Sequence, residues 1–248
     1  MKPPLRTLLL AVCCGLAAAC TQRQERLKLM SYNIRNGIGI DNIQDIDRIA
    51  RVILREAPDL VALQELDSAT LRVDGRYIPG ELGRMTGMHA TFGRAIGFAG
   101  GSYGIGLLSR TEPLAVRSIP LPGREEARVL LMAEFPDYTV CVTHLSLTPE
   151  DRHASLPLIL QATDTCRKPV LLAGDFNTGD AAAVLAGLGG GFRILSDTTR
   201  MTFPSDNPAV RIDYILGRGL PTSATVTASD HCPLWVTLAW KRGKQPGK

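Results

Sequence analysis

The sequence predicts an α/β fold, a four-layer sandwich in which two mixed β-sheets pack on each other and helices flank them. Three observations support this fold class. Short apolar runs typical of buried strands recur along the 248-residue chain and are interspersed with helix-like segments. Strands joined by short turns indicate hairpins, which do not fit the strict strand–helix alternation of a Rossmann or barrel fold. The composition, 45% hydrophobic and 21% charged, is that of an ordinary globular domain.

In the first half of the chain, the pattern predicts two strands that each end in polar residues, at 27–34 and 60–65. Between them, isoleucines at helical spacing predict a helix that Pro58 ends. A loop and a short helix near 82–85 come next. The stretch "GGSYGIGLLSR" then predicts a strand ending at Arg110, and its glycines do not follow the order of a dinucleotide-binding fingerprint.

In the second half, "ARVLLMAEF" and "TVCVTHLSL" flank "PDY" and predict a hairpin. Thr148 is expected to cap the next helix, with Pro149 at its first position and Asp151 as the acid of a capping box. Pro157 is expected to kink or interrupt this helix. The stretch "PVLLAGDFNTGD" predicts a buried strand with a polar end. A short helix at "AAAVLAGLGGG" and strands at "VRIDYIL", "TSATVTA" and "CPLWVTLAW" complete the fold.

The N-terminus has the features of an export signal. Lys2 and Arg6 precede an apolar run that is too short to remain as a membrane-spanning helix. The end of this run, "LAAAC", resembles a bacterial lipobox with Cys20 as the lipidated residue. A signal peptide without lipid is the first alternative. An apolar core helix is the second, although the run has no polar face for amphipathic packing.

These features predict four segments: a lipoprotein signal peptide (1–19), a tether (20–26), one folded domain (27–241) and a basic tail (242–248). They also predict an extracytoplasmic protein anchored by lipid to a bacterial membrane, at the outer membrane or the periplasmic face. No protein partner is implied.

Charge and cysteine content argue against some classes of function without excluding a nucleic-acid substrate. The net charge is +4, and loss of Lys2 and Arg6 with the signal would leave about +2, which is not the basic footprint of a protein that tracks a phosphate backbone. Outside the signal, Cys141, Cys166 and Cys232 form no CxxC pair. This argues against a zinc cage and allows at most one internal disulfide.

Polar residues recur where the apolar strands end. They are Asn33, Glu65, His144, Asp175 with Asn177, Asp213, and Asp230 with His231. Because a buried carboxylate is costly without a partner or a metal, we expect these strand ends to converge on one charged centre. Hard oxygen donors in an incomplete set favour Mg²⁺ or Mn²⁺. Carboxylates, histidines and such a metal together are suited to phosphoester hydrolysis.

The motifs "SYNI", "LQE", "GIGLLSR", "THL", "GDFN", "RIDYIL" and "SDHCPL" occur in the order found in the endonuclease/exonuclease/phosphatase superfamily. The chain resembles that superfamily over about residues 27–240, and "GDFN" and "SDHCPL" are the most specific elements. The resemblance implies the fold of deoxyribonuclease I and a metal-dependent hydrolase. For the metal, it implies Glu65 as the principal ligand with Asn33 beside it, and Asp230 as a further metal or network carboxylate.

The resemblance also implies catalytic roles. Asp175 would orient or deprotonate the attacking water, and Asn177 and His144 would donate hydrogen bonds to phosphate oxygens. His231 would contact the scissile phosphate. Asp213 would hold that histidine in its working tautomer, because a carboxylate on one imidazole nitrogen fixes the other toward the substrate.

Several alternatives remain open from the sequence. Tyr103 could contact substrate or pack in the core, and Arg128 could reach phosphate or the acidic residues, or line the surface. The first functional hypothesis is hydrolysis of a small or lipid-borne phosphodiester or phosphomonoester, with a lipid head group or a sugar phosphate as the substrate. An extracytoplasmic nuclease that cleaves DNA or RNA is the alternative, and a non-catalytic binding module on the same scaffold is the third.

Overall fold

The strands of the computed structural model form two six-stranded mixed sheets. The structure describes residues 24–220, 225–228 and 233–241. The first sheet has the order β11 (Thr225–Ala228), β12 (Leu234–Lys241), β1 (Gln24–Asn33), β2 (Leu60–Ser68), β4 (Gly101–Ser109) and β3 (His89–Phe98). The second has the order β5 (Ala115–Leu121), β6 (Arg128–Glu134), β7 (Thr139–His144), β8 (Val170–Asp175), β10 (Asp213–Arg218) and β9 (Arg193–Ile194). In each sheet one pair is parallel, β1 with β2 and β7 with β8.

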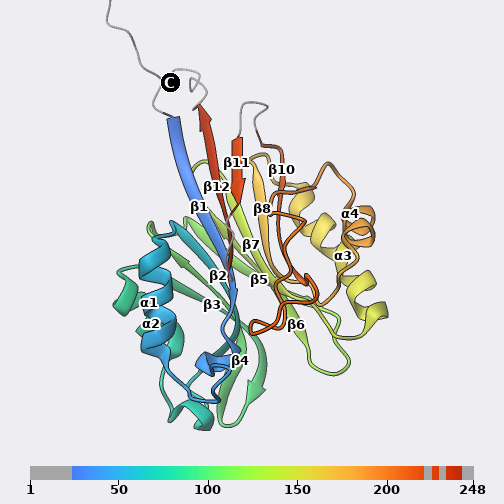
Figure 1. Ribbon diagram of the computed structural model, residues 1–248. Coiled ribbons are helices and arrows are strands. Elements are labelled where there is room, and N and C mark those ends of the chain that lie inside the picture. The colour runs from blue at the N-terminus through green and yellow to red at the C-terminus, as the bar shows by residue number, and fades with distance from the viewer. Residues whose placement is uncertain (1–23, 221–224, 229–232, 242–248) are drawn as a thin grey trace, which may run out of the picture.

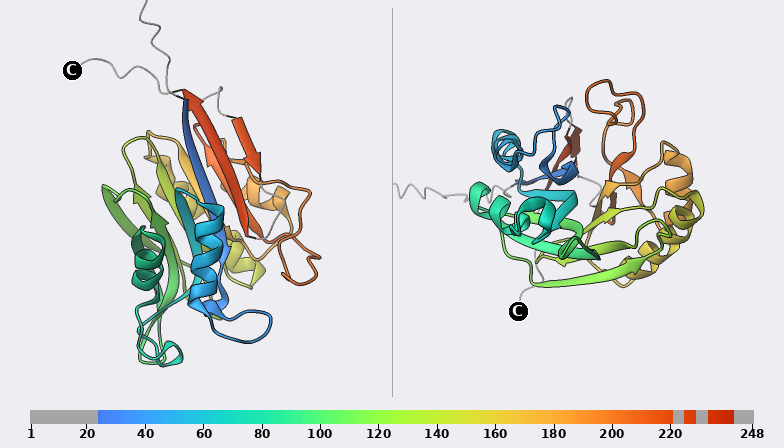
Figure 2. Two further views of the ribbon diagram at one scale, coloured as in Figure 1. Left: turned by 60° about the vertical axis from the view of Figure 1, so that its left-hand side comes forward. Right: turned by 90° about the horizontal axis from the view of Figure 1, so that it is seen from below.

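Helices cover the outer faces of both sheets. Helices α1 (Ile46–Glu56) and α2 (Ile78–Thr86) lie on the side of the first sheet, and α3 (Pro149–Asp164) and α4 (Ala181–Leu188) lie on the side of the second. Figure 2, seen from below, shows the strands between these two helical layers. The predicted four-layer sandwich is confirmed.

The alternation of side chains along the strands produces three layers of apolar packing. On β7, Val140 and Val142 pack between the sheets, whereas Cys141 packs toward α3 and α4. On β2, Leu60 lies between the sheets and Val61 packs under α1 and α2. Each sheet is therefore apolar on both faces, as expected for sheets buried on both sides.

Among the strands that the sequence pattern does not predict, the two longest, β3 and β5, are sheet edges. The outward faces of both are largely solvent-exposed, so neither has a continuous apolar run. Pro120 lies within β5, a position that an edge strand tolerates because its N–H is not needed for the ladder. Periodicity alone does not distinguish such strands from loops.

Helix α3 differs from its predicted form in two respects. It continues from Pro149 to Asp164 with Pro157 inside, so the expected interruption is wrong. The Thr148 hydroxyl makes no capping hydrogen bond and instead donates to Glu125 Oε2 at 3.2 Å, while Asp151 accepts three hydrogen bonds from Arg124. The start of α3 is thus fixed by the loop that precedes β6.

Strand β1 begins at Gln24, three residues before the predicted start of the domain. The predicted signal peptide, Cys20 and the basic tail at 242–248 lie outside the described residues. Cys141 and Cys166 are free thiols, and Cys232 is outside the described residues. None of the helices described is long and apolar enough to cross a membrane.

Candidate active site

The strand ends of the first sheet deliver Asn33 and Glu65. Asn33 is the last residue of β1, and Glu65 lies in β2 at a register shift between Leu63 and Leu66. Glu65 has φ +56°, a left-handed conformation that is uncommon for a residue with a side chain. A bulge of this kind redirects a side chain out of the normal alternation and is frequent next to active sites.

The strand ends of the second sheet deliver His144 and Asp175, which are register partners in the parallel β7–β8 pair. His144 Nε2 lies 3.8 Å from Asp175 Oδ2, and both residues are buried. The glycine before Asp175 makes this close pairing feasible: a Cβ on Gly174 would lie 2.0 Å from the Thr143 carbonyl oxygen.

Asn33 joins the two sheets. Its Nδ2 donates to Glu65 Oε1 at 2.8 Å and to Asp175 Oδ2 at 3.2 Å, so one carboxamide links carboxylates from opposite sheets. Its Oδ1 accepts a hydrogen bond from the Arg35 N–H at 3.0 Å. The predicted convergence of strand ends is therefore present for Asn33, Glu65, His144 and Asp175. In this geometry Asn33 positions the two carboxylates, and its role as a metal ligand stays a prediction.

Asp213, the first residue of β10, is the antiparallel register partner of Asp175. The pKa of Asp175 is raised, first by burial and then by the neighbouring charge of Asp213, with Glu65 adding to the effect. The pKa of Asp213 is also raised, mainly by burial, while a hydrogen bond from Thr202 opposes the shift. Three carboxylates thus gather where desolvation disfavours negative charge.

His144 is kept neutral. Burial lowers its pKa to about 3, and the nearby guanidinium of Arg128 acts in the same direction. A neutral imidazole donates one hydrogen bond and brings no positive charge. His144 is therefore suited to donate to a phosphate oxygen, and it does not act as a cation that offsets the carboxylates.

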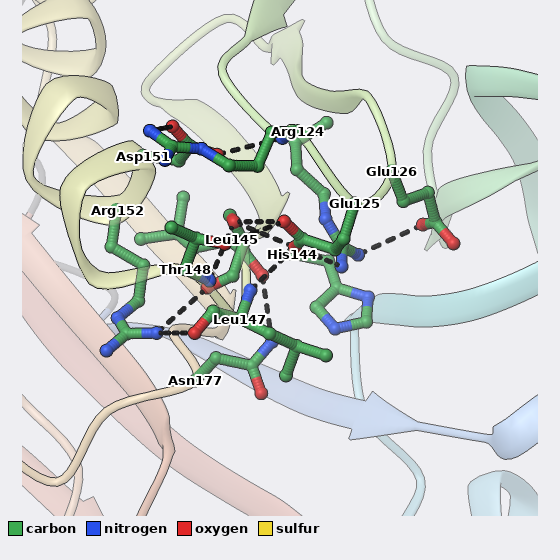
Figure 3. Close-up of polar contacts among 12 residues, drawn as sticks. Arg124, Glu125, Glu126, His144, Leu145, Leu147, Thr148, Asp151, Arg152 and Asn177 are labelled. Carbon is green, nitrogen blue, oxygen red and sulfur yellow. Dashed lines mark hydrogen bonds and ion pairs between the residues drawn. The ribbon is translucent and has the colours of Figure 1, made fainter.

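Asn177 follows β8 and has φ +51°. Its N–H donates to Asp175 Oδ1 at 2.9 Å. Its Nδ2 donates to the Leu145 carbonyl at 2.8 Å (Figure 3). A carboxamide nitrogen carries two hydrogens, so one remains for another acceptor after Leu145 O is satisfied. The Leu145 N–H in turn donates to Asp175 O at 2.9 Å, which fixes the two chain segments together.

Arg128 pairs with two nearby glutamates, and its reach to phosphate or to the acidic residues at the strand ends stays a prediction. It is buried, with Nη2 3.2 Å from Glu125 Oε1 and Nη1 3.0 Å from Glu126 Oε1. Glu125 also accepts hydrogen bonds from the Ser146 hydroxyl and the Leu147 N–H (Figure 3). This network holds the loop before β6 against the loop after His144. Glu125 and Glu126 were not among the predicted site residues, although both directly precede the strand predicted at "ARVLLMAEF".

Tyr103 is buried and lines a cavity of about 580 Å³ that extends from Glu65. Its pKa is raised by burial and by the charges of Glu65 and Glu126. Tyr103 is thus both a packed aromatic and part of a cavity wall, and its contact with substrate stays a prediction. Arg72, Phe98 and other lining residues were not singled out by the sequence, because they come from separate segments without a shared motif.

The donor set fits a hard divalent cation. In the parts of the chain that the structure describes, no three Asp, Glu, His or Cys side chains are grouped closely enough to hold a metal by themselves. Glu65, Asp175 and Asp213 nevertheless concentrate negative charge, as their mutual effects on the Asp175 pKa show. Mg²⁺ characteristically binds through one or two carboxylates and completes its shell with water and substrate oxygens. Asp230 and His231 lie outside the described residues.

Two mixed sheets with outer helices and polar residues at one set of strand ends define a deoxyribonuclease I-like protein. The chain belongs to the endonuclease/exonuclease/phosphatase family, whose model matches residues 30–234. The family resemblance inferred from the motifs is therefore confirmed. No curated protein matches the sequence.

Solved structures share the fold at low sequence identity. An endonuclease/exonuclease/phosphatase from Beutenbergia cavernae DSM 12333 is 24% identical with a TM-score of 0.65, over 88% of this chain and 72% of that chain. The mannosyl-6-phosphatase Bt3783 of Bacteroides thetaiotaomicron is 17% identical with a TM-score of 0.63, over 86% and 98%. D. rerio TDP2 in complex with a single-strand DNA product is 22% identical with a TM-score of 0.63, over 86% and 98%. At these identities the likeness establishes the fold.

Proposed function

We propose that the protein is a divalent-metal-dependent phosphoesterase that hydrolyses a small or lipid-borne phosphodiester or phosphomonoester with an activated water. One observation carries the proposal: Asn33 Nδ2 bonds carboxylates from both sheets, Glu65 at 2.8 Å and Asp175 at 3.2 Å. Folding places these groups together although they are far apart in the sequence. Membership of a family named for nucleases and phosphatases supports the same reaction class.

Each described residue has a role that its environment supports. Asp175, with its raised pKa, is suited to accept a proton from water near neutral pH, since a general base works best when its pKa is near the operating pH. Neutral His144 and the remaining N–H of Asn177 would donate to phosphate oxygens. Asp213 keeps the environment of Asp175 negative, which favours proton uptake.

Glu65 would hold the cation, and Mg²⁺ or Mn²⁺ is the ion that such oxygen donors favour. Such an ion supplies charge neutralisation of the phosphate and Lewis-acid polarisation. Asp230 and His231 are proposed to complete the site, as the motif "SDHCPL" implies.

A substrate panel tests the proposed function. Bis-p-nitrophenyl phosphate, sphingomyelin, inositol phospholipids and plasmid DNA are each incubated with Mg²⁺, with Mn²⁺ and with EDTA. We expect EDTA-sensitive hydrolysis of at least one small or lipid ester, and loss of it in Glu65→Gln. Nicking of plasmid DNA with no hydrolysis of the other substrates would instead support the nuclease. Turnover that is absent from all four, or insensitive to EDTA, would overturn the hydrolase.

We also propose that Cys20 is lipidated and anchors the protein outside the cytoplasm, on the basis of the sequence "LAAAC". In bacteria that express the full chain, the wild-type protein is expected in the membrane fraction and to incorporate labelled palmitate. Cys20→Ser is expected to lose the label. A wild-type protein that is cleaved but unlabelled would show a plain signal peptide.

A further inference from the structure

The cavity beside Glu65 differs from the catalytic centre in its chemistry. It has a volume of about 580 Å³, within the range of about 300–1,000 Å³ that is usual for small-molecule sites. Its walls come from several separate parts of the chain: Asn36, Glu65, Arg72, the β3–β4 hairpin with Phe98 and Tyr103, and the loop at residues 123–127. A phosphoester whose phosphate lies at Glu65 would place its leaving group in or near this cavity.

The cavity is poorly suited to an anion. Its two arginines are already paired, Arg72 with the fully buried Asp67 at 2.7 Å and Arg124 with Asp151 at 3.0 Å. Its remaining charged groups are carboxylates. A second phosphate, or the backbone of a nucleic acid, needs unpaired cations and would be repelled here.

The cavity is also poorly suited to a cation. The Arg72 guanidinium carbon lies 4.6 Å from the ring centre of Phe98 and 5.2 Å from that of Tyr103. The two rings, 6.3 Å apart at a 54° angle, therefore already share a stacked positive charge. A quaternary ammonium group stacked on either ring would be repelled by the positive charge of that guanidinium.

A neutral group that carries several hydroxyls is compatible with the residues that line the cavity. Phe98 is 40% exposed, so its ring offers apolar surface to the C–H face of a ring-shaped alcohol. The ion pair of Glu126 with Arg128 uses Oε1 and leaves Oε2 able to accept a hydroxyl hydrogen. Hydrogen bonds from hydroxyls to a carboxylate are charge-assisted and therefore stronger than neutral ones.

We infer that this cavity, between Phe98, Tyr103 and Glu126, is a subsite for a neutral, hydroxyl-rich leaving group such as a sugar or polyol. The inference rests on the proposed function for the phosphate position, but the binding of the alcohol itself needs no turnover. The subsite selects against leaving groups that carry further phosphates and against those that carry an ammonium group.

The first test compares phosphate esters that differ in the alcohol. Values of kcat/KM are measured with Mg²⁺ for hexose 6-phosphates, phosphocholine and fructose 1,6-bisphosphate, with bis-p-nitrophenyl phosphate as the general substrate. We expect at least one hexose 6-phosphate to exceed phosphocholine and the bisphosphate by about tenfold or more. Equal or better hydrolysis of the bisphosphate or of phosphocholine would overturn the inference.

The second test uses variants of the subsite. In Phe98→Ala and in Glu126→Gln, the kcat/KM ratio of the hexose ester to bis-p-nitrophenyl phosphate is expected to fall about tenfold. Leu158→Ala removes an exposed apolar side chain on α3, outside the cavity, and is expected to leave the ratio unchanged. Thermal melting of each variant confirms that it is folded. An unchanged ratio in both subsite variants would contradict the inference.

The third test separates this inference from the proposed function. Binding of free methyl hexosides to the EDTA-treated full chain is followed by saturation-transfer NMR, in wild type and in Phe98→Ala. Binding that Phe98→Ala abolishes supports the subsite even if no ester is hydrolysed. Metal-dependent hydrolysis of bis-p-nitrophenyl phosphate without hexoside binding and without a preference among alcohols would leave the proposed function intact and refute the subsite.

Discussion

Asp175 and Asp213 stand opposite each other as register partners of the antiparallel β8–β10 ladder, Asp175 buried and Asp213 half-buried. Two carboxylates so placed cannot both ionise without mutual repulsion, and the pKa values of both are raised. Asp175 is also linked through Asn33 to Glu65 in the other sheet. This concentration of acid groups should make the stability of the protein depend on pH and on bound metal.

The stability of the metal-free protein is expected to fall as pH rises through the neutral range. A carboxyl whose folded-state pKa is raised contributes stability that is fully present below its unfolded pKa, about 3.9 for Asp, and is lost as pH rises through the folded-state pKa. Thermal melts in EDTA between pH 5 and 8.5 measure this loss. Asp175→Asn is expected to flatten the slope, and Mg²⁺ to raise Tm most at high pH. A wild-type Tm that rises over this range in EDTA would contradict the prediction.

Two substitutions of Asn177 are expected to distinguish its role as a hydrogen-bond donor to substrate from the effect of its backbone conformation on stability. Its φ of +51° favours glycine or asparagine, so Asn177→Gly keeps the backbone conformation and removes the donor. We expect Asn177→Gly to lower kcat about 10²–10³-fold, the usual effect of removing one oxyanion donor, and to cost about 1 kcal/mol of stability for the lost hydrogen bond to Leu145 O. Asn177→Ala should lose similar activity and a further ~1 kcal/mol of stability, because alanine is strained at positive φ. Full activity in Asn177→Gly would show that this side chain is not a donor to substrate.

Arg72 is expected to be essential for stability because it is the partner of Asp67, whose side chain is completely buried. Arg72→Met would leave that carboxylate as an unpaired buried charge and is expected to cost about 3 kcal/mol. Arg76→Met is the matched control, since the Arg76–Glu81 pair is solvent-exposed, and is expected to cost less than about 1 kcal/mol. Urea unfolding of the wild type and of the two variants measures these differences in unfolding free energy. Equal losses of unfolding free energy in the two variants would refute this prediction.

Glu125 is expected to stabilise the junction between the loop before β6 and the loop after β7. Burial opposes its ionisation, but hydrogen bonds from Ser146, Leu147 and Arg128 outweigh burial and lower its pKa to about 2. A lowered pKa contributes stability that is present above the unfolded value and lost as pH falls through the folded value. Glu125→Gln should therefore cost about 1–3 kcal/mol near pH 7 and progressively less as pH falls from about 4.5 toward 2.

The control for Glu125 is Glu112→Gln, a change at an exposed position before β5 that should alter stability by no more than about 0.5 kcal/mol. Denaturant unfolding of the two variants and the wild type at several pH values measures both effects. A constant stability deficit of Glu125→Gln from pH 7 to pH 2.5 would show that the carboxylate charge is not what holds the two loops.

The sequence alone was sufficient for the class of fold and for most of the catalytic candidates. Strands such as β1, β2, β7 and β8 are buried on both faces, so they appear as apolar runs, and a polar residue at the end of such a run is conspicuous. Asn33, Glu65, His144 and Asp175 were found in this way. Edge strands β3 and β5 were missed because half of their residues face solvent.

Only the tertiary structure decided which residues share an environment. The register of β8 with β10 sets Asp213 against Asp175, and the bulge at Glu65 redirects its carboxylate; neither depends on neighbours in sequence. Likewise, Arg72, Phe98 and Glu126 line one cavity although they come from three separate segments. Local sequence patterns predict helices and strands because these patterns reflect whether each individual side chain is buried. Desolvation, ion pairing and cavity shape depend on distances between segments, and those distances exist only once the sheets have packed.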